Sequence, residues 1–160
     1  MSEAMAKHLL SQNFRTARTW PLHVFLYAGD EREMPDDLVS VRYMVDDVAE
    51  SIDFYTQHFG FELHQNASPA FAEVVRGRLR LLLAGPKSSA GRPMPDGRKP
   101  GPGGWNRIHF VVDDINAEVE RLRRAGLSFG NEIVSGPGGR QILVDDPSGN
   151  PIELFQPAES

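Results

Sequence analysis

The sequence contains one short signature twice, as Val45-Asp46-Asp47-Val48 and, 67 positions further on, as Val112-Asp113-Asp114-Ile115. Each copy follows a stretch in which apolar residues alternate with other residues, which is the period of a half-buried strand. In the first copy Glu50 comes three residues after Asp47, the spacing of a capping box at the start of a helix. The signature therefore predicts a strand followed directly by a capped helix, and it predicts this pair twice.

Apolar residues after each copy recur at helical spacing. The first stripe is followed by Gly60 and the second by Gly126, and glycine suits the left-handed position that ends a helix. Each stripe indicates one helix with a single apolar face. Its members are Val48, Ile52, Tyr55 and Phe59 in the first helix, and Ile115, Val119 and Leu122 in the second.

Short strands are expected after each helix. The end of the first half, Leu81 to Pro86, matches Ile152 to Pro157, 71 positions further on. Two repeats of this length predict a pseudo-twofold α+β fold, with two tandem βαβββ modules forming curved mixed sheets around a cleft. The expected strands are residues 39–45, 61–63, 71–75 and 79–83 in the first module, and 108–112, 129, 132–134, 141–144 and 152–155 in the second.

The remaining segments are predicted to connect or extend these modules. Residues 1–37 form an N-terminal extension, either an arm or an extra strand, and residues 38–157 form one domain. Its modules cover 38–86 and 105–157, joined by the linker 87–104, which is too rich in glycine and proline to hold a helix or a sheet ladder. A plain connection is favoured over a mobile lid.

Composition excludes several classes of protein. The chain has 160 residues, a net charge of −5 and no cysteine. An acidic chain is a poor nucleic-acid binder, and a chain without cysteine has no disulfide framework and no thiolate metal site. We read no apolar stretch long enough to span a membrane and no signal peptide, so the expected location is the cytoplasm.

Three motifs together resemble the vicinal-oxygen-chelate superfamily, which includes glyoxalases, bleomycin-resistance proteins and extradiol dioxygenases. They are Val45-Asp46-Asp47 with Phe59-Gly60-Phe61, His109 to Asp114 with Ala125-Gly126, and Asp146 to Leu154. The resemblance covers residues 38–157. It implies a small-molecule ligand, a homodimer and, in many members, a divalent metal held by one residue from each first strand and each last strand.

Carried over one by one, those four positions fall on Ser40, Leu82, Arg107 and Glu153. A serine hydroxyl is a poor ligand, leucine is none, and arginine never coordinates. We therefore expect no cofactor and no metal at this site. A divalent metal remains possible at a shifted site built on His109 and Glu153, with a third ligand from His64 or His23.

Because side chains alternate between the two sides of a strand, Ser40, Leu82, Arg107 and Glu153 are expected to share one polar face of the sheets. We expect this face to line the cleft, with Trp105 and Phe71 as further apolar walls. In one interpretation Arg107 replaces the metal's charge and forms a structural salt bridge with Glu153. In the other, the arginines outnumber Glu153 and recognise an anionic or aromatic ligand. The predicted face consists of Ser40, Arg42, Arg80, Leu82, Ala84, Arg107, His109, Glu153 and Phe155.

Two functions stay open at this point. The first is a metal-independent binding protein that sequesters a small molecule, with antibiotic resistance as one use. Ser40, Arg42, Arg80, Leu82, Trp105, Arg107 and Phe155 would then contact the ligand. The second is a lyase, isomerase or dioxygenase-type enzyme, metal-dependent or metal-free. In it Glu153 would act as general base, and His109 or Arg107 would polarise the substrate.

Overall fold

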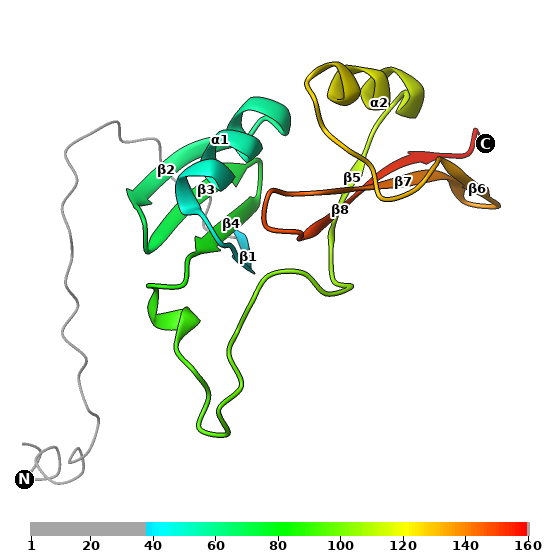
Figure 1. Ribbon diagram of the computed structural model, residues 1–160. Helices are drawn as coiled ribbons and strands as arrows, with labels where there is room; N and C mark the ends of the chain where they lie inside the picture. Colours follow the sequence, from blue (N-terminus) through cyan, green and yellow to red (C-terminus); the bar gives the residue numbers. More distant parts are fainter. Residues whose placement is uncertain (1–37, 160) are drawn as a thin grey trace, which may run out of the picture. The chain divides into compact units, whose positions relative to one another are not determined.

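A computed structural model of the chain describes residues 38–159, which belong to one compact unit (Figure 1). The proposed N-terminal extension 1–37, whether an arm or an extra strand, lies outside the described residues. No helix in the described part is long and apolar enough to cross a membrane. Eight strands, two α-helices and one short 3-10 helix make up the described fold.

The first module contains one helix and one sheet of four strands. Its sheet has the order β1-β4-β3-β2, in which β1 runs parallel to β4 and the other neighbours are antiparallel. The mixed sheet thus follows from a strand, a helix crossover and then strands that turn back on one another. The elements are β1 (Val39–Met44), α1 (Val48–His58), β2 (Glu62–Ala67), β3 (Phe71–Arg76) and β4 (Leu79–Ala84).

The second module repeats this topology. Its sheet has the order β5-β8-β7-β6, again with the first and last strands parallel. The duplication that the sequence predicts is therefore confirmed as two sheets of four strands with one helix each. The elements are β5 (Ile108–Val111), α2 (Ile115–Arg124), β6 (Val134–Gly136), β7 (Gly139–Asp145) and β8 (Pro151–Pro157).

Helix boundaries agree with the predicted caps. The Asp47 carboxylate accepts from the Glu50 N–H, and the Asp114 carboxylate accepts from the N–H groups of residues 116 and 117. Gly60 and Gly126 take φ values of 63° and 89°, the left-handed conformation that glycine adopts without steric cost. All seven residues of the two predicted apolar stripes are buried.

Two strand predictions were wrong in detail. The strand expected at residues 132–134 is β6, which covers Val134–Gly136, because it pairs with β7 directly across the tight turn 136–139. Phe129 forms only an isolated bridge with Val144. Val39, the first apolar residue of the expected strand 39–45, is 63% exposed because it begins β1, a strand at the edge of its sheet.

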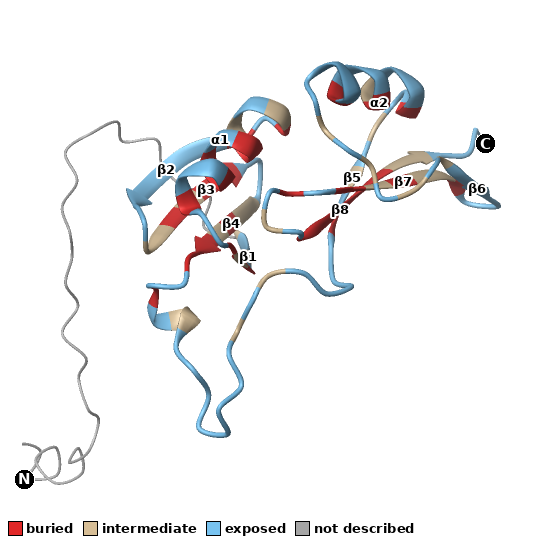
Figure 2. Ribbon diagram, viewed as in Figure 1, coloured by how far each residue is buried: buried red, intermediate tan, exposed pale blue. Residues whose placement is uncertain are grey.

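The linker is more ordered than its composition predicts. Residues Ser89–Gly91 form a 3-10 helix, which the Ser88 hydroxyl caps by accepting from the Gly91 N–H. Further along, the N–H of Gly103 donates to the Asn150 side chain at 2.9 Å, so the linker is also tied to the second module. In Figure 2 most of this segment is exposed, whereas buried residues lie mainly along β3, β4, β7 and β8 and on one side of each helix.

Buried hydrogen bonds connect the two modules. The Tyr55 hydroxyl of α1 donates to Oδ2 of Asp146, which lies in the turn between β7 and β8, at 3.0 Å. Tyr43 of β1 accepts from the Ile108 N–H at 2.9 Å. Burial raises the pKa of the Asp146 carboxyl, while hydrogen bonds from Asn150 and other neighbours oppose that rise. Burial also raises the pKa of Tyr55, so its hydroxyl stays a donor.

We expect Tyr55→Phe to lower the free energy of unfolding by about 1–2 kcal/mol, because it removes a buried donor to a carboxylate without changing the ring. Urea unfolding followed by circular dichroism measures the effect. Thr56→Val is the control, since that hydroxyl bonds only carbonyl oxygens of its own helix. Equal effects of the two substitutions would contradict a special role for the contact between modules.

Candidate functional site

Strand register assembles an open face on each sheet, opposite the helix-covered face. In the first module Ser40 pairs with Arg80 and Arg42 with Leu82, so these four side chains share one side. In the second module His109 pairs with Glu153, and Val111 pairs with Phe155. The strand residues predicted from parity as one polar set thus lie on the open faces of their own sheets.

Glu153 is the most buried charged residue of these faces. It is only 7% exposed, and the Arg107 Nε donates to its Oε2 at 2.6 Å. The His109 Nδ1 lies 3.8 Å from the other carboxylate oxygen, Oε1. The carboxylate is therefore held between a guanidinium and an imidazole, and the guanidinium supplies the compensating charge that a buried carboxylate needs.

The first module carries a second pair of the same kind, which the sequence reasoning missed. Glu73 of β3 lies across from Leu82 and within 3.8 Å of the Arg80 guanidinium, whose Nε also donates to the Ser40 hydroxyl at 2.8 Å. The sequence does contain a signal for this pair, because the alternation of side chains along the strand at 71–75 places Glu73 on the open face.

This second carboxylate changes the charge balance. By strand register the open faces hold three arginines and four carboxylates, so no positive charge remains with histidine neutral; they are Arg42, Arg80, Arg107, Glu62, Glu73, Asp145 and Glu153. The predicted cationic excess counted Glu153 as the only carboxylate, and it is absent once the carboxylates of β2, β3 and β7 are included. Arg42 is exposed and lies next to Leu82, which gives the faces a guanidinium at the surface.

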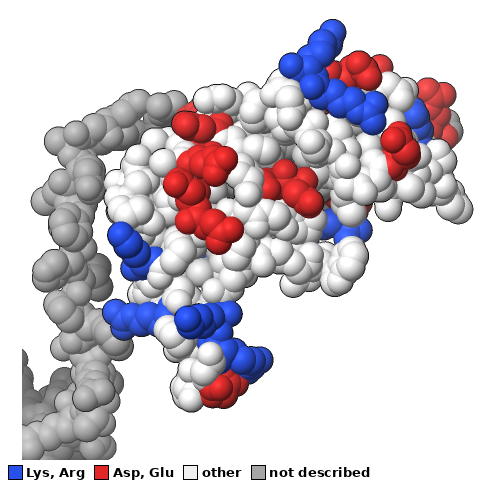
Figure 3. Space-filling model, viewed as in Figure 1, with Lys and Arg blue, Asp and Glu red and all other residues white. Residues whose placement is uncertain are grey.

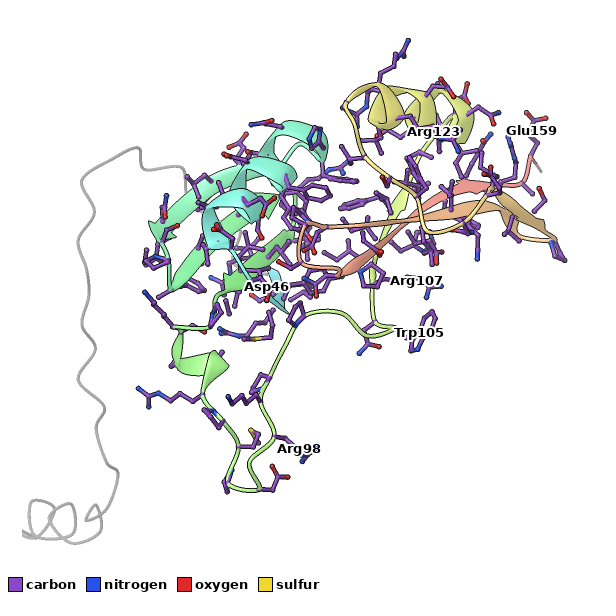
Figure 4. All side chains as sticks on the ribbon, viewed as in Figure 1. Asp46, Arg98, Trp105, Arg107, Arg123 and Glu159 are labelled. Atoms are coloured by element: carbon purple, nitrogen blue, oxygen red, sulfur yellow. The ribbon has the colours of Figure 1, made fainter. Side chains whose placement is uncertain are left out.

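The predicted aromatic walls differ in how closely they pack. Phe155 lies against His109 with 4.9 Å between ring centroids, and half-buried Phe71 pairs with Ala84. Trp105 is 85% exposed on the segment that leads into β5, so in this chain alone it forms no closed wall (Figure 4). It contacts the site through its carbonyl oxygen, to which Arg107 donates at 3.4 Å.

The donor set does not fit a divalent metal. Arg107 stands at one of the four ligand positions, and its guanidinium donates to Glu153, the carboxylate at another. The Ser40 hydroxyl at a third position accepts a hydrogen bond from Arg80. Among residues 38–159, no cluster of three or more His, Cys, Asp or Glu is placed to hold an ion. The shifted site would thus lack a third described ligand beside His109 and Glu153, and His23 lies outside the described residues.

The fold and the open faces define a class of protein in which paired βαβββ modules bind or transform small molecules. A family model for the Glyoxalase/Bleomycin resistance protein/Dioxygenase superfamily matches residues 37–154. The chain therefore belongs to this superfamily. A comparison with curated protein sequences gave no match.

Solved structures with similar folds include both enzymes and binding proteins. A member of this superfamily from Sphaerobacter thermophilus is 28% identical, with a TM-score of 0.59 over 74% of this chain and 95% of that chain. The antibiotic binding protein TnmS3 from Streptomyces sp. CB03234 is 26% identical, with a TM-score of 0.57 over 76% and 95%. A lactoylglutathione lyase from Agrobacterium tumefaciens, at 22% identity and a TM-score of 0.61 over 76% and 94%, shares the fold.

We expect Arg107 and Glu153 to be energetically coupled. In a double-mutant cycle of Arg107→Met and Glu153→Gln, the coupling in unfolding free energy should be about 1–2 kcal/mol, because one partner is buried. Urea unfolding of the four proteins measures it. The matched control is Arg98 with Asp96, an ion pair of 2.7 Å that is exposed on both sides. That pair should show no measurable coupling, and equal coupling in both cycles would contradict the assignment.

Proposed function

We propose that this chain is a metal-independent protein that binds a small anionic, aromatic molecule on its open faces. The supporting observation is the distance of 2.6 Å between Arg107 and the buried Glu153. A permanent cation thus lies where the resemblance expects a metal ligand. A guanidinium there compensates the carboxylate and still presents donors to a ligand, because the Arg107 side chain is 32% exposed.

The chemistry of the exposed groups supports an anion with a flat body. Arg42 and Arg80 provide planar donor groups that match carboxylate, phosphate or sulfate oxygens. Leu82 and Phe155 provide apolar surface beside them, and Trp105 is free to cover a ring. Antibiotic binding is one form of this function, supported by the likeness to TnmS3 at 26% identity.

The same proposal includes a homodimer. Val111 is 64% exposed at the end of β5 on the open face of the second module, and Trp105 is exposed before the start of the same strand. Exposed apolar residues of this kind are typical of surfaces that another chain or a ligand covers. A partner subunit over this face would enclose the ligand. The predicted partners thus remain a small molecule and a second copy, with no nucleic acid or membrane, in the cytoplasm.

We expect protein purified without a histidine tag to contain far less than one metal ion per chain, as measured by inductively coupled plasma mass spectrometry.

We also expect naphthalene-2-carboxylate to bind more tightly than its uncharged carboxamide in isothermal titration calorimetry. Arg42→Ala and Arg80→Ala should each weaken carboxylate binding about tenfold, through a lost charge-assisted hydrogen bond. Arg92→Ala on the linker is the control and should leave binding unchanged. Stoichiometric metal, or tighter binding of a cationic analogue, would contradict the proposal.

A second candidate is an enzyme that uses Glu153 as general base. The position of His109 favours it, because its Nδ1 lies 3.8 Å from Oε1 of Glu153 and an imidazole near a carboxylate is a common partner in proton transfer. If the chain is such an enzyme, Glu153→Gln should abolish turnover of a substrate that still binds. If it is a binding protein, the same variant should alter affinity only. Substrate screening by mass spectrometry, with and without added divalent metal, separates these outcomes.

A further inference from the structure

The linker forms one side of a pocket at the end of the open face of the first module, which it meets at Met44 of β1. Its segments 86–93 and 99–102 come together with the end of β1 to line a half-open cavity of about 360 Å³. That volume lies at the lower end of the roughly 300–1,000 Å³ found for small-molecule pockets. The lining residues are Met44, Val45, Asp46, Pro86, Gly91, Pro93, Lys99, Pro100, Gly101 and Pro102.

Hydrogen bonds hold the linker in this shape. The Ser88 cap fixes its beginning, and the Met94 N–H donates to the Arg98 carbonyl at 2.7 Å to close a turn in its middle. The Gly103 N–H fixes its end on Asn150. Prolines add to this order because their φ angles are set in advance. The pocket is therefore formed before a ligand arrives, which reduces the entropy cost of binding.

The walls of the pocket are apolar and rigid. Four of the lining residues are prolines, and Met44 adds an adaptable thioether side chain. Pyrrolidine rings and a methionine side chain offer flat or deformable hydrocarbon surface, which suits an aromatic ring or a branched aliphatic group. A plain connection between modules would not need this surface.

Two opposite charges complete the lining. Lys99 comes from the linker, and Asp46 follows β1, where its own N–H donates to the Ser148 hydroxyl at 2.8 Å and so fixes the backbone beside the pocket. The pocket therefore has no net charge but carries one cation and one anion. Figure 4 shows Asp46 beside the first sheet and Arg98 at the far tip of the linker, and Figure 3 shows further Lys and Arg side chains on the linker.

We propose that this linker pocket binds a small zwitterion with an apolar body, of the chemical class of a hydrophobic amino acid. The ligand's carboxylate pairs with the Lys99 ammonium, and its ammonium group pairs with the Asp46 carboxylate. Its side chain packs among the proline rings and Met44. This inference does not rest on the proposed function, because none of Arg42, Arg80, Arg107 and Glu153, which carry that function, lines the pocket.

Isothermal titration calorimetry on the full chain with four probes tests the proposal: L-phenylalanine, 3-phenylpropionate, 2-phenylethylamine and benzyl alcohol. L-Phenylalanine should bind most tightly. Lys99→Ala should weaken L-phenylalanine and 3-phenylpropionate about threefold to tenfold and leave 2-phenylethylamine unchanged. Asp46→Asn should weaken L-phenylalanine and 2-phenylethylamine and leave 3-phenylpropionate unchanged. Lys87→Ala, which removes a linker lysine outside the pocket, should change none of the affinities.

A filling substitution provides an independent readout. Gly101 lines the pocket, a Cβ there meets nothing within 4 Å and its φ lies outside the glycine-only region, so Gly101→Trp adds an indole ring at the pocket rim without backbone strain and is expected to weaken L-phenylalanine binding. Arg42→Ala should leave that binding intact, which separates this pocket from the open faces. Circular dichroism and thermal unfolding verify the fold of each variant. No saturable binding of L-phenylalanine, or binding that ignores both Lys99→Ala and Asp46→Asn, would overturn the proposal.

Discussion

The buried carboxylate of Asp146 is the contact on which the arrangement of both modules depends. It lies in the turn between β7 and β8 and accepts hydrogen bonds from Tyr55, from the backbone of Ser148 and from both the backbone and the side chain of Asn150. Asn150 in turn donates to the Met44 carbonyl at the end of β1. These hydrogen bonds hold the turn between β7 and β8 in shape and attach it to α1 and β1 of the first module. They form because each of these buried polar groups needs a partner.

This constraint also positions the surfaces that bear on function. Because β1 and β8 are both held near the same turn, the open-face residues of β1 and of β8 have fixed backbones. Gly103 binds the same Asn150 side chain, so the linker and its pocket depend on that turn as well. The open faces and the linker pocket are nevertheless chemically different. The former carry two carboxylate–guanidinium pairs, whereas the latter is apolar with one lysine and one aspartate.

Much of the fold could be predicted from local patterns. The duplicated Asp-Asp signature, the apolar stripes and the glycines after each helix act over a few residues, and each appears in the structure where it was expected. The boundary of β6 and the exposure of Val39 could not be predicted, because they depend on which strand pairs across a turn and on which strand lies at a sheet edge. The 3-10 turn in the linker likewise depends on one serine hydroxyl, which composition alone does not reveal.

For the candidate site, the sequence by itself determined the residue types: a serine, a leucine and an arginine at three of the four positions where the resemblance expects metal ligands, with Glu153 at the fourth. Only the tertiary structure decided their partners. It brought Arg107 within 2.6 Å of Glu153, added Glu73 beside Arg80, and left Trp105 exposed. It also turned a glycine- and proline-rich connection into the wall of a cavity. The physical reason is that side-chain identity is local, whereas burial, charge pairing and enclosure depend on residues brought together from distant parts of the chain.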